Sequence, residues 1–136
     1  MTFVVDTSVT MAWCFEDEAT PETEAVLDRL RDDDAVVPDL WRLEVVNVLL
    51  VGERRRRISE AQATRFVELL AQLPIRVDPT ATDLTTVLSV GRRHALSAYD
   101  AAYLSLAERL AAPLATKVAH LAAASRVAGV TTLLQP

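Results

Sequence analysis

Short apolar runs alternate with longer segments of helical periodicity along the whole chain, and this alternation restricts the fold more than any other feature. The short runs predict five strands, at Phe3–Asp6, Ala35–Val37, Ile75–Val77, Leu114–Ala115 and Thr131–Leu134. Helices are predicted between them, at about Ser8–Phe15, Pro21–Arg31, Leu40–Arg55, Glu60–Leu73, Ala81–His94, Ala98–Leu110 and Val118–Ala128. Strands that alternate with helices favour a parallel sheet covered by helices on both faces. We therefore expect an α/β fold.

Several predicted helices begin with residues that cap helix N-termini. Thr20 places a hydroxyl directly before Pro21, and proline suits the first turn of a helix. Three segments have the spacing of a capping box or a close variant of it: Ser59–Gln62, Thr80–Asp83 and Ser97–Asp100. These signals support the predicted helix starts.

The chain has 136 residues and just over half of them are apolar, which suits one domain with one hydrophobic core. No apolar run reaches the roughly 18 residues that a membrane-spanning helix needs, and the start shows no signal-peptide pattern. Cys14 is the only cysteine, which excludes an internal disulfide and zinc sites built on cysteine pairs. We expect a single domain over residues 1–136 in the reducing cytoplasm, with no membrane association.

The net charge of −5 argues against a protein that simply coats nucleic acid. It leaves room for an enzyme that acts on nucleic acid, because carboxylates that hold a metal ion add negative charge. The only dense basic cluster is Arg54–Arg57, at the end of a predicted helix. Its two interpretations are equally favoured: a solvated helix end, or an RNA-binding group that contacts phosphates.

Three carboxylates occupy unusual places in the predicted elements. Asp6 ends the first apolar strand and is followed by two hydroxyls that can support it, Thr7 and Ser8. Glu44 lies within an otherwise apolar helical run, and Asp100 begins a later helix. The carboxyl ends of parallel strands meet at one edge of the sheet, where open sheets bind ligands. Buried carboxylates are costly unless a positive group meets them, so their convergence suggests a hard divalent cation such as Mg²⁺.

Each carboxylate also has a structural interpretation. Asp6 is as well placed to cap the following helix as to bind a metal ion. Asp100 occupies the third position of a capping box, which favours a structural role when this residue is considered alone. Glu44 is different, because a helix that is apolar nearly all round is buried, and Asn47 lies one turn away. A ligand at Glu44 supported by the Asn47 amide is favoured over a hydrogen bond that only fixes packing.

The other polar and aromatic residues give weaker signals. Thr116 follows the short fourth strand and adds a hydroxyl to the same edge of the sheet. His94 and His120 lack the paired spacing of a metal site and are interpreted as structural. Tyr103 is assigned to core packing rather than to the stacking of bases.

Four segments of the chain together resemble the PIN-domain ribonucleases, and most of all the VapC toxins of VapBC toxin–antitoxin modules. In chain order these segments are Val5–Val9, Pro38–Asn47, His94–Tyr103 and Pro113–Thr116. No single segment decides the resemblance, but the four occur in the right order and spacing over essentially the whole chain.

This resemblance implies a three-layer α/β/α sandwich with a mostly parallel central sheet. It implies Mg²⁺- or Mn²⁺-dependent endoribonuclease cleavage of structured RNA, by attack of an activated water on a phosphodiester. It also implies a homodimer within a toxin–antitoxin hetero-oligomer, in which a cognate VapB-type antitoxin lays a C-terminal segment into the acidic groove. Asp6, Glu44 and Asp100 match three acidic residues of the family as catalytic residues and metal ligands. Asn47 and Thr116 match its polar support.

One departure from the family pattern concerns the segment after Thr116. Many members place an aspartate two residues after this threonine, and here that position holds Val118, with Lys117 beside it. No Asp or Glu follows Glu108, so no later carboxylate can replace the missing acid. The departure raises an alternative function: a catalytically weakened PIN domain that acts by binding RNA or an antitoxin.

A second alternative is a phospho-accepting receiver domain, which also gathers acids at the edge of its sheet. Thr116 and Lys117 fit the threonine and lysine of such a domain. A receiver needs adjacent acids after its first strand, whereas Asp6 is followed by Thr7, and the surroundings of Asp78 do not suit an acceptor. This alternative is therefore strongly disfavoured.

Overall fold

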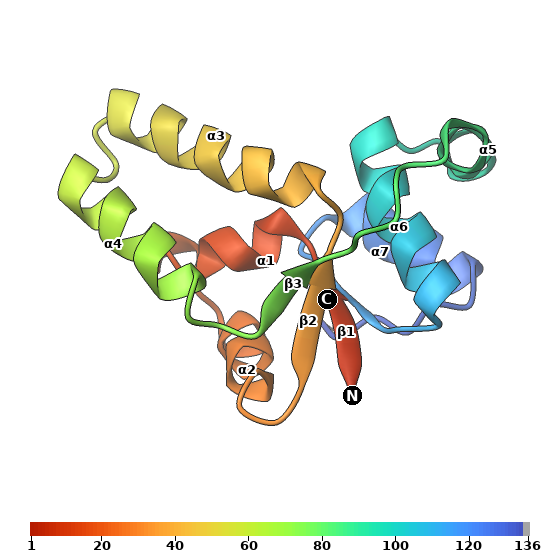
Figure 1. Ribbon diagram of the computed structural model, residues 1–136, viewed down its shortest axis with the longest axis horizontal. Helices are drawn as coiled ribbons and strands as arrows, with labels where there is room; N and C mark the ends of the chain where they lie inside the picture. The colour runs from red at the N-terminus through yellow and green to blue at the C-terminus, as the bar shows by residue number, and fades with distance from the viewer. Residues whose placement is uncertain (135–136) are drawn as a thin grey trace.

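The computed structural model of the protein describes residues 1–134, which form four strands and seven α-helices (Figure 1). The strands are β1 (Thr2–Val5), β2 (Asp34–Val37), β3 (Ile75–Val77) and β4 (Leu114–Ala115). The helices are α1 (Thr7–Ala12), α2 (Pro21–Arg29), α3 (Leu40–Arg54), α4 (Glu60–Leu70), α5 (Leu84–His94), α6 (Ala98–Leu110) and α7 (Ala119–Val127). A short 3₁₀ helix, η1 (Glu16–Glu18), follows α1.

All four strands are parallel and form one sheet in the order β3-β2-β1-β4. The chain builds outward from β1 to β3 and then returns to add β4 on the other side of β1. The strand order therefore reverses between β1 and β4. Parallel α/β sheets bind ligands at the carboxyl ends of the strands beside such a reversal.

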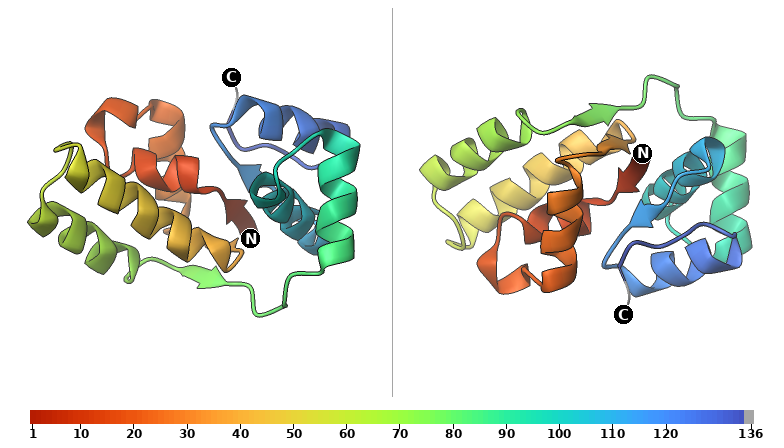
Figure 2. Two further views of the ribbon diagram at one scale, coloured as in Figure 1. Left: turned by 90° about the horizontal axis from the view of Figure 1, so that it is seen from above. Right: turned by 90° about the horizontal axis from the view of Figure 1, so that it is seen from below.

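The helices cover both faces of the sheet, as Figures 1 and 2 show. Helices α1 to α4 lie on one side, and α5 to α7 lie on the other. Strands β1, β2 and β4 are almost fully buried, with Phe3, Val4, Val36 and Leu114 at 0% exposure, whereas the edge strand β3 is partly exposed. The predicted α/β class with helices on both faces of a parallel sheet is confirmed.

One predicted strand did not form, and several helix ends lie up to three residues from the predicted positions. The strand predicted at Thr131–Leu134 is reduced to one parallel bridge between Leu114 and Thr132. Helix α5 begins at Leu84 rather than Ala81, because the Asp83 carboxylate caps the helix by accepting the backbone N–H of Thr85. The first helix ends at Ala12, and the chain continues into η1 instead of reaching Phe15 as a helix.

Two features fix α3, the helix that carries Glu44. Trp41 is buried at its start, and the indole N–H donates to Thr10 Oγ1 of α1 at 3.0 Å. This bond fastens α3 to α1 three residues before Glu44.

The expectation that α3 is buried all round was wrong, because Leu43, Val46 and Leu50 are 76%, 46% and 43% exposed.

Candidate active site

Asp6 directly follows β1 and is only 4% exposed. Its Oδ2 accepts hydrogen bonds from two hydroxyls, Ser8 Oγ at 2.7 Å and Thr116 Oγ1 at 2.7 Å. The residue occupies the N-cap position of α1 but makes no side-chain cap hydrogen bond. Its carboxylate therefore faces the reversal between β1 and β4, and the capping interpretation is not what the structure shows.

Strand register explains why Thr116 reaches Asp6 from so far along the chain. Val5 pairs with Ala115, so the next residues of the two strands are neighbours, and the Asp6 N–H donates to Ala115 O at 2.9 Å. Thr116 Oγ1 accepts the Val118 N–H at 3.0 Å, which leaves its own O–H free to donate to Asp6. The backbone thus fixes the direction in which this hydroxyl points.

Glu44 is half-buried on α3, and its Oε1 accepts hydrogen bonds from two other elements. Thr7 Oγ1 of α1 lies at 3.0 Å and the Tyr103 hydroxyl of α6 at 2.6 Å, and these two hydroxyls are 2.8 Å apart. Tyr103 itself is 0% exposed. Asn47 is exposed, and no hydrogen bond joins it to Glu44 within residues 1–134. The support of Glu44 therefore comes from Thr7 and Tyr103.

The sequence interpretation missed Tyr103 as a site residue, although it contained a signal. Tyr103 follows Asp100 by three residues, and residues three apart lie on the same face of a helix. A buried tyrosine hydroxyl also needs a hydrogen-bond partner. These two points together place Tyr103 beside the acids.

Asp100 lies in the first turn of α6, and its carboxylate does not serve the helix cap. Its backbone N–H donates to Ser97 Oγ at 3.1 Å, but the reciprocal bond that would complete a capping box is absent from this described helix. The carboxylate Oδ2 instead lies 3.0 Å from His120 Nε2 of α7. The structural interpretation of Asp100 as a capping residue thus accounts for its backbone but not for its side chain.

The carboxylates influence each other electrostatically. Burial raises the pKa of Asp6 above its ordinary value, the Ser8 and Thr116 hydroxyls oppose this shift, and the charge of Asp100 adds to it. Burial also raises the pKa of Glu44, against the hydrogen bonds from Tyr103 and Thr7 and together with the charges of Asp6 and Asp100. No neighbouring cation contributes to either shift. Asp6 and Glu44 therefore present negative charge without a neighbouring protein counter-charge.

The donor atoms suit a hard divalent cation, although the acids do not form a closed cage. Glu44 Oε2 and Asp100 Oδ1 accept no hydrogen bond in the described part of the chain, so each carboxylate keeps one oxygen unengaged. Within residues 1–134, no three Asp, Glu, His or Cys side chains lie close enough to share one ion. Mg²⁺ retains several waters and often uses only one or two carboxylates. The arrangement fits an ion held partly through water.

The sequence of the chain matches the PIN domain over residues 3–126. The chain belongs to the PIN-domain family. This assignment excludes the receiver-domain alternative, and it agrees with the acids found at the β1–β4 reversal.

Known proteins resemble this PIN domain in sequence and in fold. Ribonuclease VapC3 of Pyrobaculum aerophilum is 29% identical over 118 residues, which cover 85% of this chain and 88% of the relative. The crystal structure of PAE2754 from Pyrobaculum aerophilum has a TM-score of 0.76 at 21% identity and covers 98% of this chain and 90% of its own.

Two further solved structures contain toxin–antitoxin proteins. A toxin–antitoxin complex from Klebsiella pneumoniae matches at a TM-score of 0.68 and 16% identity, over 98% of this chain and 99% of its own. VapBC2 from Rickettsia felis, bound to a promoter DNA fragment, matches at 0.68 and 10% identity, over 97% of each chain. At these identities the matches establish the fold. No helix in the described part of this PIN domain meets the length and hydrophobicity needed to cross a membrane.

The segment after β4 contains Val118, at the position of the missing family acid, and Lys117 beside it. Val118 is partly buried against the core and precedes α7 without a side-chain cap bond. The ammonium group of Lys117 donates to the backbone carbonyl of Glu18 at 3.0 Å, while its backbone N–H donates to Ser8 Oγ at 2.9 Å. Val118 therefore offers no oxygen ligand, and the Lys117 ammonium is held at η1.

The arginine run lies at the opposite end of α3 from Glu44. Ten residues of helix separate Glu44 from Arg54, which corresponds to about 15 Å. Arg57 pairs with Asp17 and Glu18 and lies over the Phe15 ring, 4.1 Å from its centroid. The exposed side chains of Arg54, Arg55 and Arg56 complete the run. Arg57 is therefore bound by Asp17 and Glu18, whereas Arg54, Arg55 and Arg56 extend the run on the surface.

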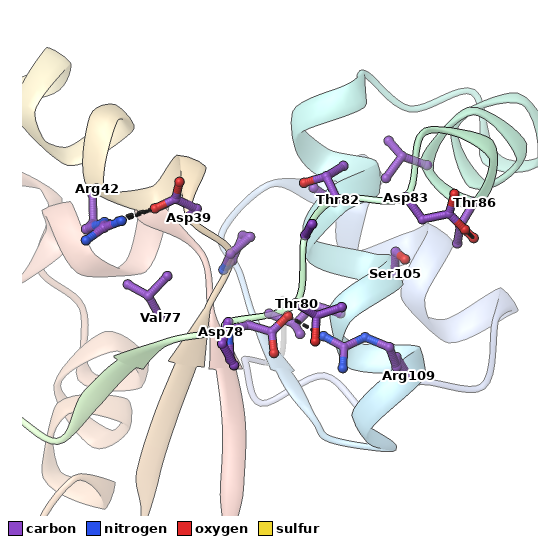
Figure 3. Close-up of a pocket in the computed structure, with 16 residues that line it drawn as sticks. Asp39, Arg42, Val77, Asp78, Thr80, Thr82, Asp83, Thr86, Ser105 and Arg109 are labelled. Carbon is purple, nitrogen blue, oxygen red and sulfur yellow. Dashed lines mark hydrogen bonds and ion pairs between the residues drawn. The ribbon is translucent and has the colours of Figure 1, made fainter.

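A pocket occupies the half of the same sheet edge that lies beyond β2 and β3. This pocket has a volume of about 590 Å³ and lies where β2 and β3 end, between α3 and α6 (Figure 3). Two of its three acids are paired with arginines of its own wall: Asp39 with Arg42, and Asp78 with Arg109. The third, Asp83, caps α5. Asp39 and Asp78 thus have protein counter-charges, unlike Asp6 and Glu44.

Proposed function

We propose that this PIN domain is a metal-dependent endoribonuclease toxin of the VapC type. One observation carries the proposal: a nearly fully buried carboxylate, Asp6, is held by two hydroxyls and by no cation, at the strand reversal of a parallel sheet. A buried charge of this kind is costly in a protein unless a ligand compensates for it. The similarity to a protein named Ribonuclease VapC3 supports RNA as the class of substrate.

Mg²⁺ or Mn²⁺ is the proposed cofactor, and Asp6, Glu44 and Asp100 are the residues that would hold it, in part through water, because no three such side chains in residues 1–134 lie close enough to share an ion directly. When bound, such an ion activates water and relieves charge on a phosphodiester. The residues of the chain prepare the site for it. Ser8 and Thr116 orient Asp6. Tyr103 and Thr7 hold Glu44 in an analogous way.

Structured RNA is the proposed substrate, and Arg54, Arg55 and Arg56 are the proposed phosphate contacts. They are exposed, and the surrounding acidic chain offers no denser basic group in its sequence. Arg57 is left out of this proposal because it is engaged by Asp17 and Glu18.

An antitoxin of the VapB type is the proposed inhibitory partner, with a homodimer of this chain inside the complex. The unpaired acids attract Arg or Lys side chains of a partner. Leu43, Val46 and Leu50 give α3 an exposed apolar face, which suits a protein interface. Structural neighbours described as a toxin–antitoxin complex and as VapBC2 support this kind of assembly.

A catalytically weakened PIN domain is the second candidate function, and Val118 is the observation that favours it. Its side chain contributes no oxygen where many relatives carry an acid. Under this alternative the chain still binds RNA or an antitoxin, but cleavage is slow even with metal ion present.

Calorimetric titration with Mn²⁺ tests the proposed site directly. Asp6→Asn, Glu44→Gln and Asp100→Asn should each weaken Mn²⁺ binding, while Asp83→Asn should not, because asparagine also caps helices well and Asp83 only caps α5. Mapping of RNA ends after incubation with the wild-type chain tests the reaction. Unchanged Mn²⁺ affinity in all three acid variants would refute the metal site, and uncut RNA with intact Mn²⁺ binding would favour the weakened PIN domain.

A further inference from the structure

Of the side chains of Lys117, Val118 and His120, which follow Thr116, only that of His120 contacts one of the acids. Val118 packs against the core, and the Lys117 ammonium binds the Glu18 carbonyl. His120, in the first turn of α7, lies 3.0 Å from Asp100 through Nε2 and Oδ2. Helix α7 therefore reaches the acids through a histidine.

The direction of this hydrogen bond follows from the chemistry of the two groups. An ionised carboxylate can only accept hydrogen bonds, so with Asp100 ionised His120 Nε2 carries a hydrogen atom and donates a hydrogen bond to Asp100 Oδ2. The histidine side chain is 66% exposed, whereas that of Asp100 is 20% exposed. His120 thus approaches Asp100 from the solvent side and engages only one of its two oxygens.

The helix caps of the chain show that this contact replaces another one. In α2 and α4 the third helical residue, Thr23 or Gln62, returns its side chain to the backbone N–H of the capping residue. In α6 the backbone N–H of Asp100 still meets Ser97, but its carboxylate is at His120. The side chain that would normally complete the cap is therefore directed elsewhere.

We propose that His120 is a positioning residue that orients Asp100 for a divalent cation. The inference rests on the proposed metal-dependent function of the site. His120 holds Oδ2 and leaves Oδ1 as the oxygen without a hydrogen bond in the described chain. His120 thus supports Asp100 from α7, in a chain that has Val118 where many relatives carry a fourth acid.

The expected size of the effect comes from the behaviour of groups that orient metal ligands. Loss of a hydrogen-bonding partner of a ligand typically weakens metal affinity about 10–100-fold, because the ligand must be ordered when the ion binds. His120→Ala removes the donor at an exposed helical position where alanine is a good helix former. His120→Gln keeps an N–H donor on a side chain of comparable reach.

The test is calorimetric titration of the whole chain with Mn²⁺. We expect His120→Ala to weaken Mn²⁺ binding about 10–100-fold and His120→Gln to restore affinity to within about threefold of wild type. His94→Gln is the matched control, because His94 ends α5 and makes no contact with Asp100 among the hydrogen bonds of the described residues. Far-UV circular dichroism of each variant checks that it folds.

A double-mutant cycle separates positioning from a general structural role. If His120 acts through Asp100, then adding His120→Ala to Asp100→Asn should cause no further loss of Mn²⁺ affinity. Additive losses would overturn the inference, and so would a His120→Gln variant as weak as His120→Ala, because that result makes the imidazole itself the ligand. Unchanged affinity in His120→Ala, with weakened binding in Asp6→Asn, would overturn only the role of His120. Unchanged affinity in Asp6→Asn and Asp100→Asn as well would overturn the proposed function.

Discussion

The two halves of the carboxyl edge of the sheet carry similar acids in opposite electrostatic settings. Beyond β2 and β3, Asp39 and Asp78 are each paired with an arginine of the same wall. Beyond β1, Asp6 is buried among hydroxyls, and no cation lowers its pKa. The hydroxyls fix the Asp6 carboxylate without neutralising it, whereas the arginines neutralise their partners.

The difference separates a half of the sheet edge whose acids are neutralised within the fold from a half whose acid keeps its negative charge. An exposed ion pair such as Asp39–Arg42 adds little to stability and leaves almost no net charge for a ligand. A buried carboxylate held by neutral donors remains a negative centre in a region of low dielectric constant. Four predictions test this contrast, from the largest expected effect to the smallest.

The largest effect should come from replacing one acid in each half of the sheet edge, in separate variants. Asp6→Asn should lower RNA cleavage about 1000-fold, which is about 4 kcal/mol of barrier, because it removes the negative centre of the site. Asp78→Asn should change cleavage less than about threefold, since Arg109 already neutralises this acid. Single-turnover cleavage assays measure both rates. Equal losses in the two variants would abolish the distinction between the two halves.

Removal of one supporting hydroxyl should give the next largest effect. Tyr103→Phe leaves Glu44 with Thr7 as its remaining hydroxyl donor, so we expect a loss of cleavage of about 10–100-fold. Tyr99→Phe is the matched control, because Tyr99 is 63% exposed on the same helix. Thermal unfolding of both variants checks that the fold survives. A Tyr103→Phe variant as active as Tyr99→Phe would show that Thr7 alone is sufficient.

Adding an acid to the β1–β4 side should increase the contrast. Val118→Asp restores the family carboxylate and should raise cleavage about tenfold, or about 1.4 kcal/mol of barrier, at low Mg²⁺. The positions of the cuts in the RNA should stay the same. Val127→Asp, at an 81% exposed position at the end of the helix that Val118 precedes, controls for the added charge. A wild-type rate that already equals that of Val118→Asp at low Mg²⁺ would make the missing acid irrelevant.

The smallest effect concerns stability and pH in the metal-free chain. Burial raises the pKa of Asp6 in the folded state, so the folded chain binds a proton more readily than the unfolded chain. Stability should therefore fall as the pH rises above the ordinary value of 3.8 and through the raised pKa. Asp6→Asn removes this cost and should raise the free energy of unfolding at pH 7 by about 0.5–2 kcal/mol.

Urea denaturation in the presence of a chelator measures this difference at acidic and neutral pH. Asp78→Asn should instead lower stability by up to about 1 kcal/mol at neutral pH, because it breaks a partly exposed ion pair. The sign of the change thus distinguishes the two acids. A destabilised Asp6→Asn variant at pH 7 would contradict the view that Asp6 is held at a cost to the fold.

Much of the backbone and part of the site follow from the sequence, for identifiable physical reasons. Alternating apolar runs and helical periodicity predict the parallel sheet, and strand-end logic places Asp6 and Thr116 at one edge. The β-strand predicted near Thr132 fails because only one bridge forms there, to Leu114. The start of a helix depends on which of several side chains accepts the first free backbone N–H groups. Asp83 does so in α5, so this helix begins at Leu84 and not at the predicted Ala81.

The partners of the acids were harder to predict because they depend on the packing of distant elements. Helical spacing favoured Asn47 as the support of Glu44, yet the packing of α3 leaves Asn47 exposed. Tyr103 and His120 reach the acids from α6 and α7, and local sequence does not specify these approaches. The roles of the predicted site residues remain predictions for the experiments above.

The pairing of β1 with β4 also determines when, during synthesis of the chain, Asp6 can meet Thr116. Asp6 and Thr116 are 110 residues apart, and their hydrogen bond closes a loop that contains most of the protein. Contacts of such high sequence separation form late in folding, and ribosomes add only about 5–20 residues per second. A nascent chain therefore spends seconds with the β4-facing edge of β1 unpaired and with Asp6 lacking the Thr116 hydroxyl. Any translation product that stops before Leu114 lacks the strand that completes the site, so incomplete synthesis yields no competent copy of it.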